Sequence, residues 1–148
     1  MKNEKNSLKL RPVKKSDCLF LYDLLKERDP RTNISHKKMP TFTQHKKFVL
    51  SKPYSKWYII QNFENDVGSV YLTKDNEIGI FLKKNLQSKG IGGNALKLLI
   101  EKNPKSRYLA NVNPQNKKSI QFFKNNGFKL IQYTFELEKS KNKRIQSA

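Results

Sequence analysis

The sequence has a single cysteine, Cys18, and no apolar run long enough to cross a membrane. One cysteine cannot form an internal disulfide, which is typical of proteins from reducing compartments. A membrane span needs about 18 apolar residues in succession, and the N-terminus also lacks the apolar run of a signal peptide. We therefore expect a cytoplasmic protein in which Cys18, within the apolar run 18–22, is buried and unreactive.

Acidic residues and arginines are also scarce. The 148 residues include 31 Lys or Arg but only 12 Asp or Glu, which gives a net charge of +19, and only five of the basic residues are arginine. A field this strong attracts nucleic acids and phosphorylated ligands. Arginine, however, is the residue preferred for specific phosphate and base contacts. The charge therefore favours a solvated lysine surface over a specific nucleic-acid site.

The apolar patterns predict one domain with alternating and helical segments. The sequence shows no internal repeat or linker, so we expect a single domain over 1–148, with a core at about 8–137 and a basic tail at 138–148. Three-residue connections indicate an antiparallel meander at its centre. We predict an α/β (α+β) fold with a mixed, mostly antiparallel twisted sheet of about six strands and about four helices. The expected strands are 7–13, 55–63, 67–73, 77–83, 106–113 and 128–138, and the expected helices are 17–28, 44–52, 91–103 and 114–127.

Half of the six glycines lie in the stretch Q-S-K-G-I-G-G-N-A (87–95), between a predicted strand and a predicted helix. A helix N-terminus offers unpaired N–H groups and a partial positive charge, and glycines let a ligand approach the backbone closely. This combination is typical of a phosphate site. The alternative is a tight turn that binds nothing.

Two well-known phosphate motifs do not explain the glycines. No window of the chain contains the Walker A pattern G-x-x-x-x-G-K-[ST]. The dinucleotide pattern G-x-G-x-x-A is present by letter at Gly90, Gly92 and Ala95. It follows a meander rather than a first strand, however, and the next predicted strand ends at 111–113 without the acid that would bind the ribose.

A second motif lies in V-N-P-Q-N-K-K-S-I-Q-F-F-K-N-N-G-F (112–128), which has an Asn, a small residue, an aromatic residue and a final Gly-Phe. Together with Q-x-x-G-x-G at 87–92 and with the order of elements, it resembles the GNAT superfamily of acetyl-CoA-dependent N-acetyltransferases. The resemblance covers about residues 8–137. The residues of the second motif are Asn116, Ser119, Phe123, Gly127 and Phe128.

The resemblance implies a bound acetyl-CoA and no metal. In such proteins the sheet is splayed beside the strand before the glycine loop, whose backbone pairs with pantetheine, and the loop amides hold the pyrophosphate. Plain core packing of Phe81 and Leu82, and capping of a helix by Asn116, remain as alternatives. The residues expected to contact acetyl-CoA are Phe81, Leu82, Lys83, Gln87, Ser88, Lys89, Gly90, Ile91, Gly92, Gly93, Asn94, Asn116, Ser119 and Phe123.

The implied reaction transfers acetyl from a thioester to a neutral amine, so it needs a base and benefits from an acid. Glu77 is the candidate base, and its alternative is a solvated acid in a turn. Many family members have a tyrosine acid at the position of Phe123, which cannot donate a proton. Tyr71, Tyr108 and Tyr133 are the candidate substitutes, unless the thiolate leaves unassisted.

The acceptor is expected beside the early loop, where Asp29, His36 and His45 are candidate contacts. The region 27–48 is similar to that of bacterial enzymes that acetylate amino sugars, which suggests a nucleotide-linked amino sugar. We expect a monomer or homodimer acting on a small-molecule amine, without a specific nucleic-acid or membrane partner. The alternatives are a protein or peptide N-acetyltransferase, a catalytically weak CoA-binding module, and a basic nucleic-acid-binding domain.

Overall fold

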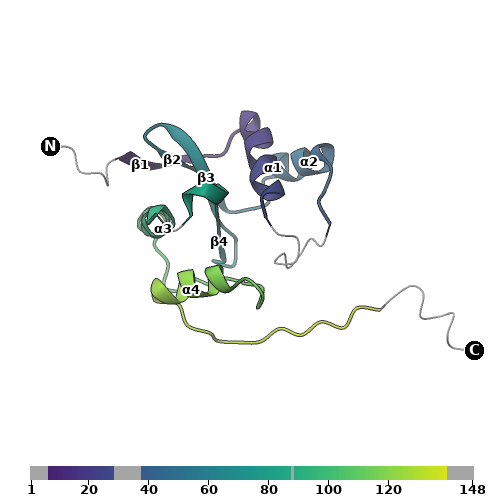
Figure 1. Cartoon of the computed structure of the whole chain (residues 1–148), viewed down its shortest axis with the longest axis vertical. Coiled ribbons are helices and arrows are strands. Elements are labelled where there is room, and N and C mark those ends of the chain that lie inside the picture. The colour runs from purple at the N-terminus through teal and green to yellow at the C-terminus, as the bar shows by residue number, and fades with distance from the viewer. Residues whose placement is uncertain (1–6, 29–37, 88, 140–148) are drawn as a thin grey trace, which may run out of the picture.

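The computed structural model describes residues 7–28, 38–87 and 89–139 (Figure 1). Four strands are followed by the glycine stretch and then by two of the four α-helices. The elements in chain order are β1 (Leu8–Pro12), η2 (Lys15–Asp17), α1 (Cys18–Lys26), α2 (Phe42–Leu50), β2 (Lys56–Asn62), β3 (Asn65–Leu72), β4 (Ile78–Leu82), η4 (Lys84–Leu86), α3 (Ile91–Lys102) and α4 (Lys117–Asn125).

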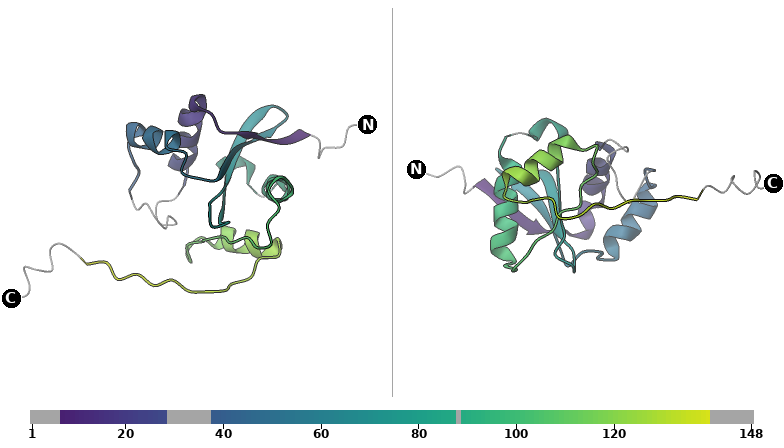
Figure 2. Two further views of the ribbon diagram at one scale, coloured as in Figure 1. Left: turned by 180° about the vertical axis from the view of Figure 1, so that it is seen from behind. Right: turned by 90° about the horizontal axis from the view of Figure 1, so that it is seen from below.

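The four strands form an antiparallel sheet in the order β1-β2-β3-β4. Helix α3 covers one face of the sheet, and α1 and α2 cover the other (Figures 1 and 2). Helix α4 packs against the start of α3, where the Phe122 ring faces Gly92. None of the helices in the described ranges is long and apolar enough to cross a membrane.

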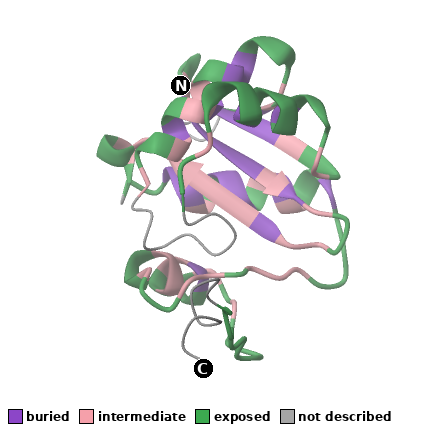
Figure 3. Ribbon diagram, turned by 90° about the vertical axis from the view of Figure 1, so that its right-hand side faces the viewer, coloured by how far each residue is buried: buried purple, intermediate pink, exposed green. Residues whose placement is uncertain are grey.

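Alternation along the strands builds one core on each face of the sheet (Figure 3). Ile60 and Val70 are fully buried in the larger core beneath α3. Ile59 points to the opposite face, where it packs with Cys18 and Leu21 of α1. The prediction that Cys18 is buried is confirmed, since only 4% of it is exposed.

The fold class and the four α-helices are as predicted, but the number of strands is not. The expected strand at 106–113 is reduced to a single parallel bridge between Glu77 and Leu109. The expected strand at 128–138 pairs with no other strand in the part of the chain that the structure describes. Over the described ranges the sheet therefore has four strands rather than about six.

The segment 128–138 shows why its alternation was misleading. Tyr133 contacts Phe135 on one face of the segment, and Gln132 contacts Thr134 on the other, so the backbone is extended as the pattern predicts. Figure 1 shows that the segment runs away from the sheet, and 76% of Tyr133 is exposed. Alternation reports two unlike faces, whereas a strand also needs a neighbour with which to bond.

An ion-pair network fixes the start of α1 on the sheet. Both guanidinium ends of Arg11, on β1, donate to the Asp17 carboxylate at 2.8 Å, and one also reaches Asp66 of β3 at 3.2 Å. The Asp17 carboxylate also accepts the Lys14 N–H at 2.8 Å. Burial raises the pKa of Asp17, but the Arg11 guanidinium and the Lys14 N–H outweigh it and hold this pKa below its usual value.

We expect Asp17→Ala to lower the free energy of unfolding by about 3 kcal/mol, because it removes the carboxylate that binds both ends of the Arg11 guanidinium and leaves this half-buried charge with only the 3.2 Å contact to Asp66. Urea denaturation at pH 7 measures the loss. Since the pKa of Asp17 is lowered on folding, its contribution is present above about pH 4 and is lost as the pH falls through the lowered pKa. The difference in the free energy of unfolding between the wild type and Asp17→Ala should therefore become smaller in acid.

Asp23→Ala is the matched control. Asp23 pairs with Lys26 at 3.7 Å on the exposed side of α1, and such pairs contribute less than about 1 kcal/mol. An equal loss in the two variants would contradict the role given to Asp17.

Candidate active site

Strand β4 has one bonded edge and one nearly free edge. The Thr73 N–H donates to Glu77 O and the Lys83 N–H donates to Val67 O, so the odd-numbered residues of β4 bond to β3. The even-numbered residues point the other way, and the Ile78 N–H donates to Leu109 O at 2.8 Å. Beyond this bridge, β4 and the chain after Leu109 make no further pairing within the described residues.

The open part of this edge belongs to Ile80 and Leu82. Their N–H groups and the Ile80 carbonyl bond to no other group in the described residues, while the Leu82 carbonyl accepts a 3.5 Å bond from Gln87 Nε2. Of the three strand residues expected to pair with pantetheine, Leu82 thus offers its backbone. Phe81 and Lys83 bond to β3 instead. Ile80, which was not among the expected residues, also has its backbone groups on the open edge, because the register of the strand pair decides which residues point there.

The glycine stretch forms the N-terminus of α3, but each glycine has a different role. Gly90 has φ +80°, a left-handed conformation that favours glycine. Gly92 is buried against Phe122, and a Cβ there would lie 3.0 Å from that ring. The Asn94 N–H is bonded to Gly90 O, so the amides of the three preceding helix residues remain as donors. Of the remaining loop residues, Lys89 is exposed, and Ser88 lies outside the described residues.

Helix α4 brings Asn116 and Ser119 to its N-terminus. The Asn116 Oδ1 accepts the Ser119 N–H at 3.2 Å, so the capping alternative holds for this atom. The Asn116 Nδ2 group makes no hydrogen bond in the described part of the chain. At the other end, Phe128 N–H donates to Phe123 O and Gly127 N–H donates to Lys124 O, a Schellman ending. The Phe123 ring packs on Phe128 in that motif, which explains its burial.

Glu77 lies one residue before β4 and is held in place by its neighbours. Its carboxylate accepts a hydrogen bond from Asn111 Nδ2 at 2.6 Å and another from Thr73 Oγ1 at 3.2 Å. These bonds join the β3–β4 turn to the segment that follows the bridge at Leu109. The candidate base is thus an oriented carboxylate rather than a freely solvated one.

The three candidate tyrosine acids occupy very different places. The Tyr108 hydroxyl donates to Asn103 O at 2.7 Å and accepts the Lys105 N–H at 2.8 Å, so it holds a turn together. Tyr133 lies in the segment that runs away from the sheet (Figure 1). Only Tyr71 lies on the sheet beside β4, opposite Gly79.

Tyr71 is part of an aromatic layer on the face of the sheet that carries α1 and α2. Its ring lies directly over Gly79, where a Cβ would collide with it. Tyr54 stacks on Tyr71, with the ring centroids 3.8 Å apart, and Phe81 lies 6.1 Å from Tyr71 on the other strand. Burial raises the pKa of Tyr71, although Tyr54 and Arg28 partly oppose this. The phenol therefore keeps its proton at neutral pH.

The expected acceptor residues are only partly described. His45 of α2 is buried, with 8% exposed, and it packs between the rings of Tyr22 and Phe48. It is therefore not a surface histidine. Asp29 and His36 lie outside the described residues.

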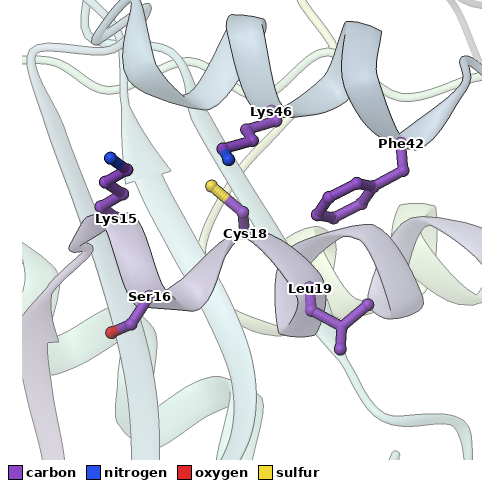
Figure 4. Close-up of a pocket in the computed structure, with 6 residues that line it drawn as sticks. All are labelled: Lys15, Ser16, Cys18, Leu19, Phe42 and Lys46. Carbon is purple, nitrogen blue, oxygen red and sulfur yellow. The ribbon is translucent and has the colours of Figure 1, made fainter.

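A cavity of about 490 Å³ lies elsewhere, between η2, the start of α1 and α2. Figure 4 shows Cys18 on its wall beside Phe42 and Lys46. Its lining includes none of the residues expected at the active site. Within the described ranges, no group of three or more His, Cys, Asp or Glu side chains is arranged to hold a metal ion.

A family model described as "Acetyltransferase (GNAT) family" matches residues 19–128 of the chain. This range runs from α1 to the end of the α4 motif and includes the open edge of β4 and the glycine stretch. No curated protein matches the sequence significantly.

Solved structures share the fold at low sequence identity. A domain from Methanocaldococcus jannaschii superposes with a TM-score of 0.74 at 24% identity, over 87% of this chain and 92% of that one. RimL, a ribosomal L7/L12 alpha-N-protein acetyltransferase in complex with coenzyme A, superposes with a TM-score of 0.69 at 17% identity, over 88% of this chain and 84% of that one. A spermidine N-acetyltransferase from Vibrio cholerae superposes with a TM-score of 0.63 at 17% identity, over 83% of this chain and 80% of that one.

We expect Gly79→Ala to displace the Tyr71 ring and to break its stack with Tyr54. The new methyl group occupies the space of the ring, so the free energy of unfolding should fall by about 1–3 kcal/mol. The near-ultraviolet circular dichroism of the tyrosines should weaken at the same time.

Gly93→Ala serves as the comparison for this change. A Cβ at Gly93 meets only Asn126 Oδ1, at an ordinary 3.6 Å, and alanine favours a helix by up to about 1 kcal/mol. Its stability should be unchanged or higher. Unaltered tyrosine dichroism in Gly79→Ala would contradict the packing described here.

Proposed function

The chain belongs to the GNAT family of acetyltransferases, and on this premise we propose that it acetylates a primary amine of a small-molecule acceptor, with acetyl-CoA as the donor. The observation that carries the proposal is the open edge of β4 next to the glycine-rich N-terminus of α3. Acetyl-CoA supplies the acetyl group as a thioester.

The two ends of this site fit two parts of the donor. The free backbone groups of Ile80 and Leu82 can bond to the amides of an extended pantetheine arm, as an added strand bonds to a sheet edge. The unpaired amides of Ile91, Gly92 and Gly93 can receive the pyrophosphate at the positive end of α3. Asn116 lies at the start of α4 with Nδ2 available as a further donor.

Proton transfer is assigned to Glu77 and Tyr71. A carboxylate held by Asn111 and Thr73 can take the proton that the attacking amine loses, directly or through water. Tyr71 has the position and the protonated state for a donor to the leaving sulfur, the role that Phe123 cannot fill. Tyr108 and Tyr133 are less suitable, since one hydroxyl is engaged in a turn and the other lies on the outlying segment.

A nucleotide-linked amino sugar is the acceptor that we favour. The net charge of +19 attracts phosphorylated acceptors and repels polycations such as spermidine. The region 27–48 supports the same class through its similarity to enzymes that acetylate amino sugars. Acetylation of a protein N-terminus, the activity of the structural neighbour RimL, is the rival activity.

Mass spectrometry of an amine panel tests this function. The purified protein and acetyl-CoA are incubated with one class of amine in each reaction. The classes are nucleotide-linked amino sugars, peptides and polyamines. We expect the amino sugar to be acetylated. We also expect CoA to raise the melting temperature, since a ligand at about 100 times its Kd adds about 2.7 kcal/mol to the free energy of unfolding. Acetylated peptides without acetylated sugar would contradict the acceptor, and no response to CoA would contradict the function.

Tyr71→Phe tests the assigned acid. It should lower kcat by about 10–100-fold with little change in KM, because a proton donor acts mainly in the transition state. Tyr108→Phe and Tyr133→Phe are the controls and should retain kcat within about twofold. Equal rates for all three variants would show that no tyrosine of this set is the acid.

A further inference from the structure

Arg28 follows the last turn of α1 and lies over the strand that we assign to the donor. Its guanidinium carbon is 4.4 Å from the centre of the Phe81 ring. The preceding residue, Glu27, accepts the Lys84 N–H at 2.7 Å and so ties the end of α1 to the chain just after β4. The position of Arg28 above the aromatic layer is thus fixed by the fold.

The Arg28 guanidinium has no acceptor for its hydrogen bonds in the part of the chain that the structure describes. None of the ion pairs or hydrogen bonds of the described residues includes it, and Glu27 is already bonded to Lys84. A guanidinium has five N–H donors, and a ring face satisfies none of them fully. Burial lowers the pKa of Arg28, which the Tyr71 and Tyr54 phenols only partly offset.

A second donor in the same aromatic layer also lacks an acceptor. The buried Trp57 Nε1–H has no hydrogen-bond partner among the described residues. The Trp57 and Tyr54 rings pack edge to face, with their centroids 4.8 Å apart. Tyr54 in turn stacks on Tyr71. The layer therefore holds two sets of donors without an acceptor.

Even the partial removal of a charge from water is costly, so a half-buried charge in a folded protein usually has a partner. A cation–π contact with Phe81 recovers only part of that cost. Elsewhere in this chain, the partly buried Arg11 binds two carboxylates. Arg28 differs from Arg11 in having no carboxylate among the described residues, and perturbed, unpaired groups of this kind gather at ligand sites.

We propose that Arg28 binds an oxyanion of the acceptor, so that the substrate is an amine with a phosphate or carboxylate close to its amino group. The proposal rests on the proposed function, since it places the acceptor between α1 and β4. The planar fork of the guanidinium suits either oxyanion. The Tyr54–Tyr71 stack lies in the same aromatic layer, and the absence of a side chain at Gly79 leaves room for the Tyr71 ring.

This site separates two classes of amine. A cationic acceptor such as spermidine would bring its other ammonium groups toward Arg28, whereas an anionic acceptor would neutralise it. The substrate named for the Vibrio cholerae neighbour is accordingly one that this chain should reject.

Matched acceptor pairs test the proposal. With saturating acetyl-CoA, glucosamine 1-phosphate is compared with glucosamine, β-alanine with β-alanine amide, and spermidine is included. We expect kcat/KM for the anionic member of at least one pair to exceed that of its neutral partner by about 100-fold. The pair that shows the preference tells whether the oxyanion is a phosphate or a carboxylate.

Arg28→Met should remove the preference, mainly by raising KM for the anionic acceptor, and should leave the rate with the neutral acceptor within about threefold. Arg28→Lys should retain part of the preference for the anionic acceptor. Arg107→Met, at an exposed position, removes the same charge from the surface and should change little. A preference for spermidine or for neutral amines in the wild type, or an equal loss with both members in Arg28→Met, would overturn the proposal.

Binding separates failure of this proposal from failure of the proposed function. Melting temperatures are measured with CoA and each member of the two pairs, for the wild type and Arg28→Met. If no amine is acetylated, the function fails, and an Arg28-dependent shift with glucosamine 1-phosphate or β-alanine still supports the anion site. No Arg28-dependent shift, together with no anionic preference in rate, overturns it.

Discussion

The candidate active site depends on one constraint: β4 is bonded to β3 along one edge and nearly free along the other. The bridge at Leu109, whose carbonyl accepts the Ile78 N–H and whose N–H donates to Asn76 O, is the one backbone pairing that the described residues make across that edge. Because the chain diverges after this bridge, polar backbone groups of Ile80 and Leu82 remain without partners in the described residues. Such groups are costly to leave unbonded wherever they are shielded from water, and an extended ligand can bond to them as a strand would.

Several parts of the site follow from the open edge. The chain leaves β4 through η4 and begins α3 at Gly90, which places the amides of the helix at the end of that edge. Gly92 lets α4 approach α3 closely, through its contact with Phe122. Glu77 holds the other end, where its bond to Asn111 fixes the point at which the two segments part. The aromatic layer and Arg28 then cover β4 from the side of α1.

The sequence predicts the local features well because they are set by neighbours along the chain. The glycine stretch, the capping by Asn116 and the helix ending at Gly127 depend on residues within a few positions. The role of Arg28 depends on Phe81, Tyr54 and Tyr71, which come from other elements, so no local pattern reveals it. The prediction of a strand at 128–138 is wrong because it also depends on a distant element. The alternation of the segment does not show whether a partner strand lies beside it.

The positive charge of the chain has two components with different meanings. Most of it is carried by 26 lysines spread along the sequence, and the charges of solvent-exposed lysines are screened by salt. Arg28 is half-buried beside aromatic rings, where screening is weak and a single anion gains more. General attraction of phosphorylated compounds and specific recognition of one of them are thus assigned to different residues.

Amide hydrogen exchange at β4 shows whether the donor binds along the open edge. Without ligand, the Ile80 and Leu82 amides should exchange faster than those of Gly79 and Phe81, which bond to β3. With saturating CoA, the exchange of Ile80 and Leu82 should slow by about tenfold or more, and that of Gly92 and Gly93 should slow as well. If CoA raises the melting temperature but leaves the exchange of Ile80 and Leu82 unchanged, the donor does not bind along β4.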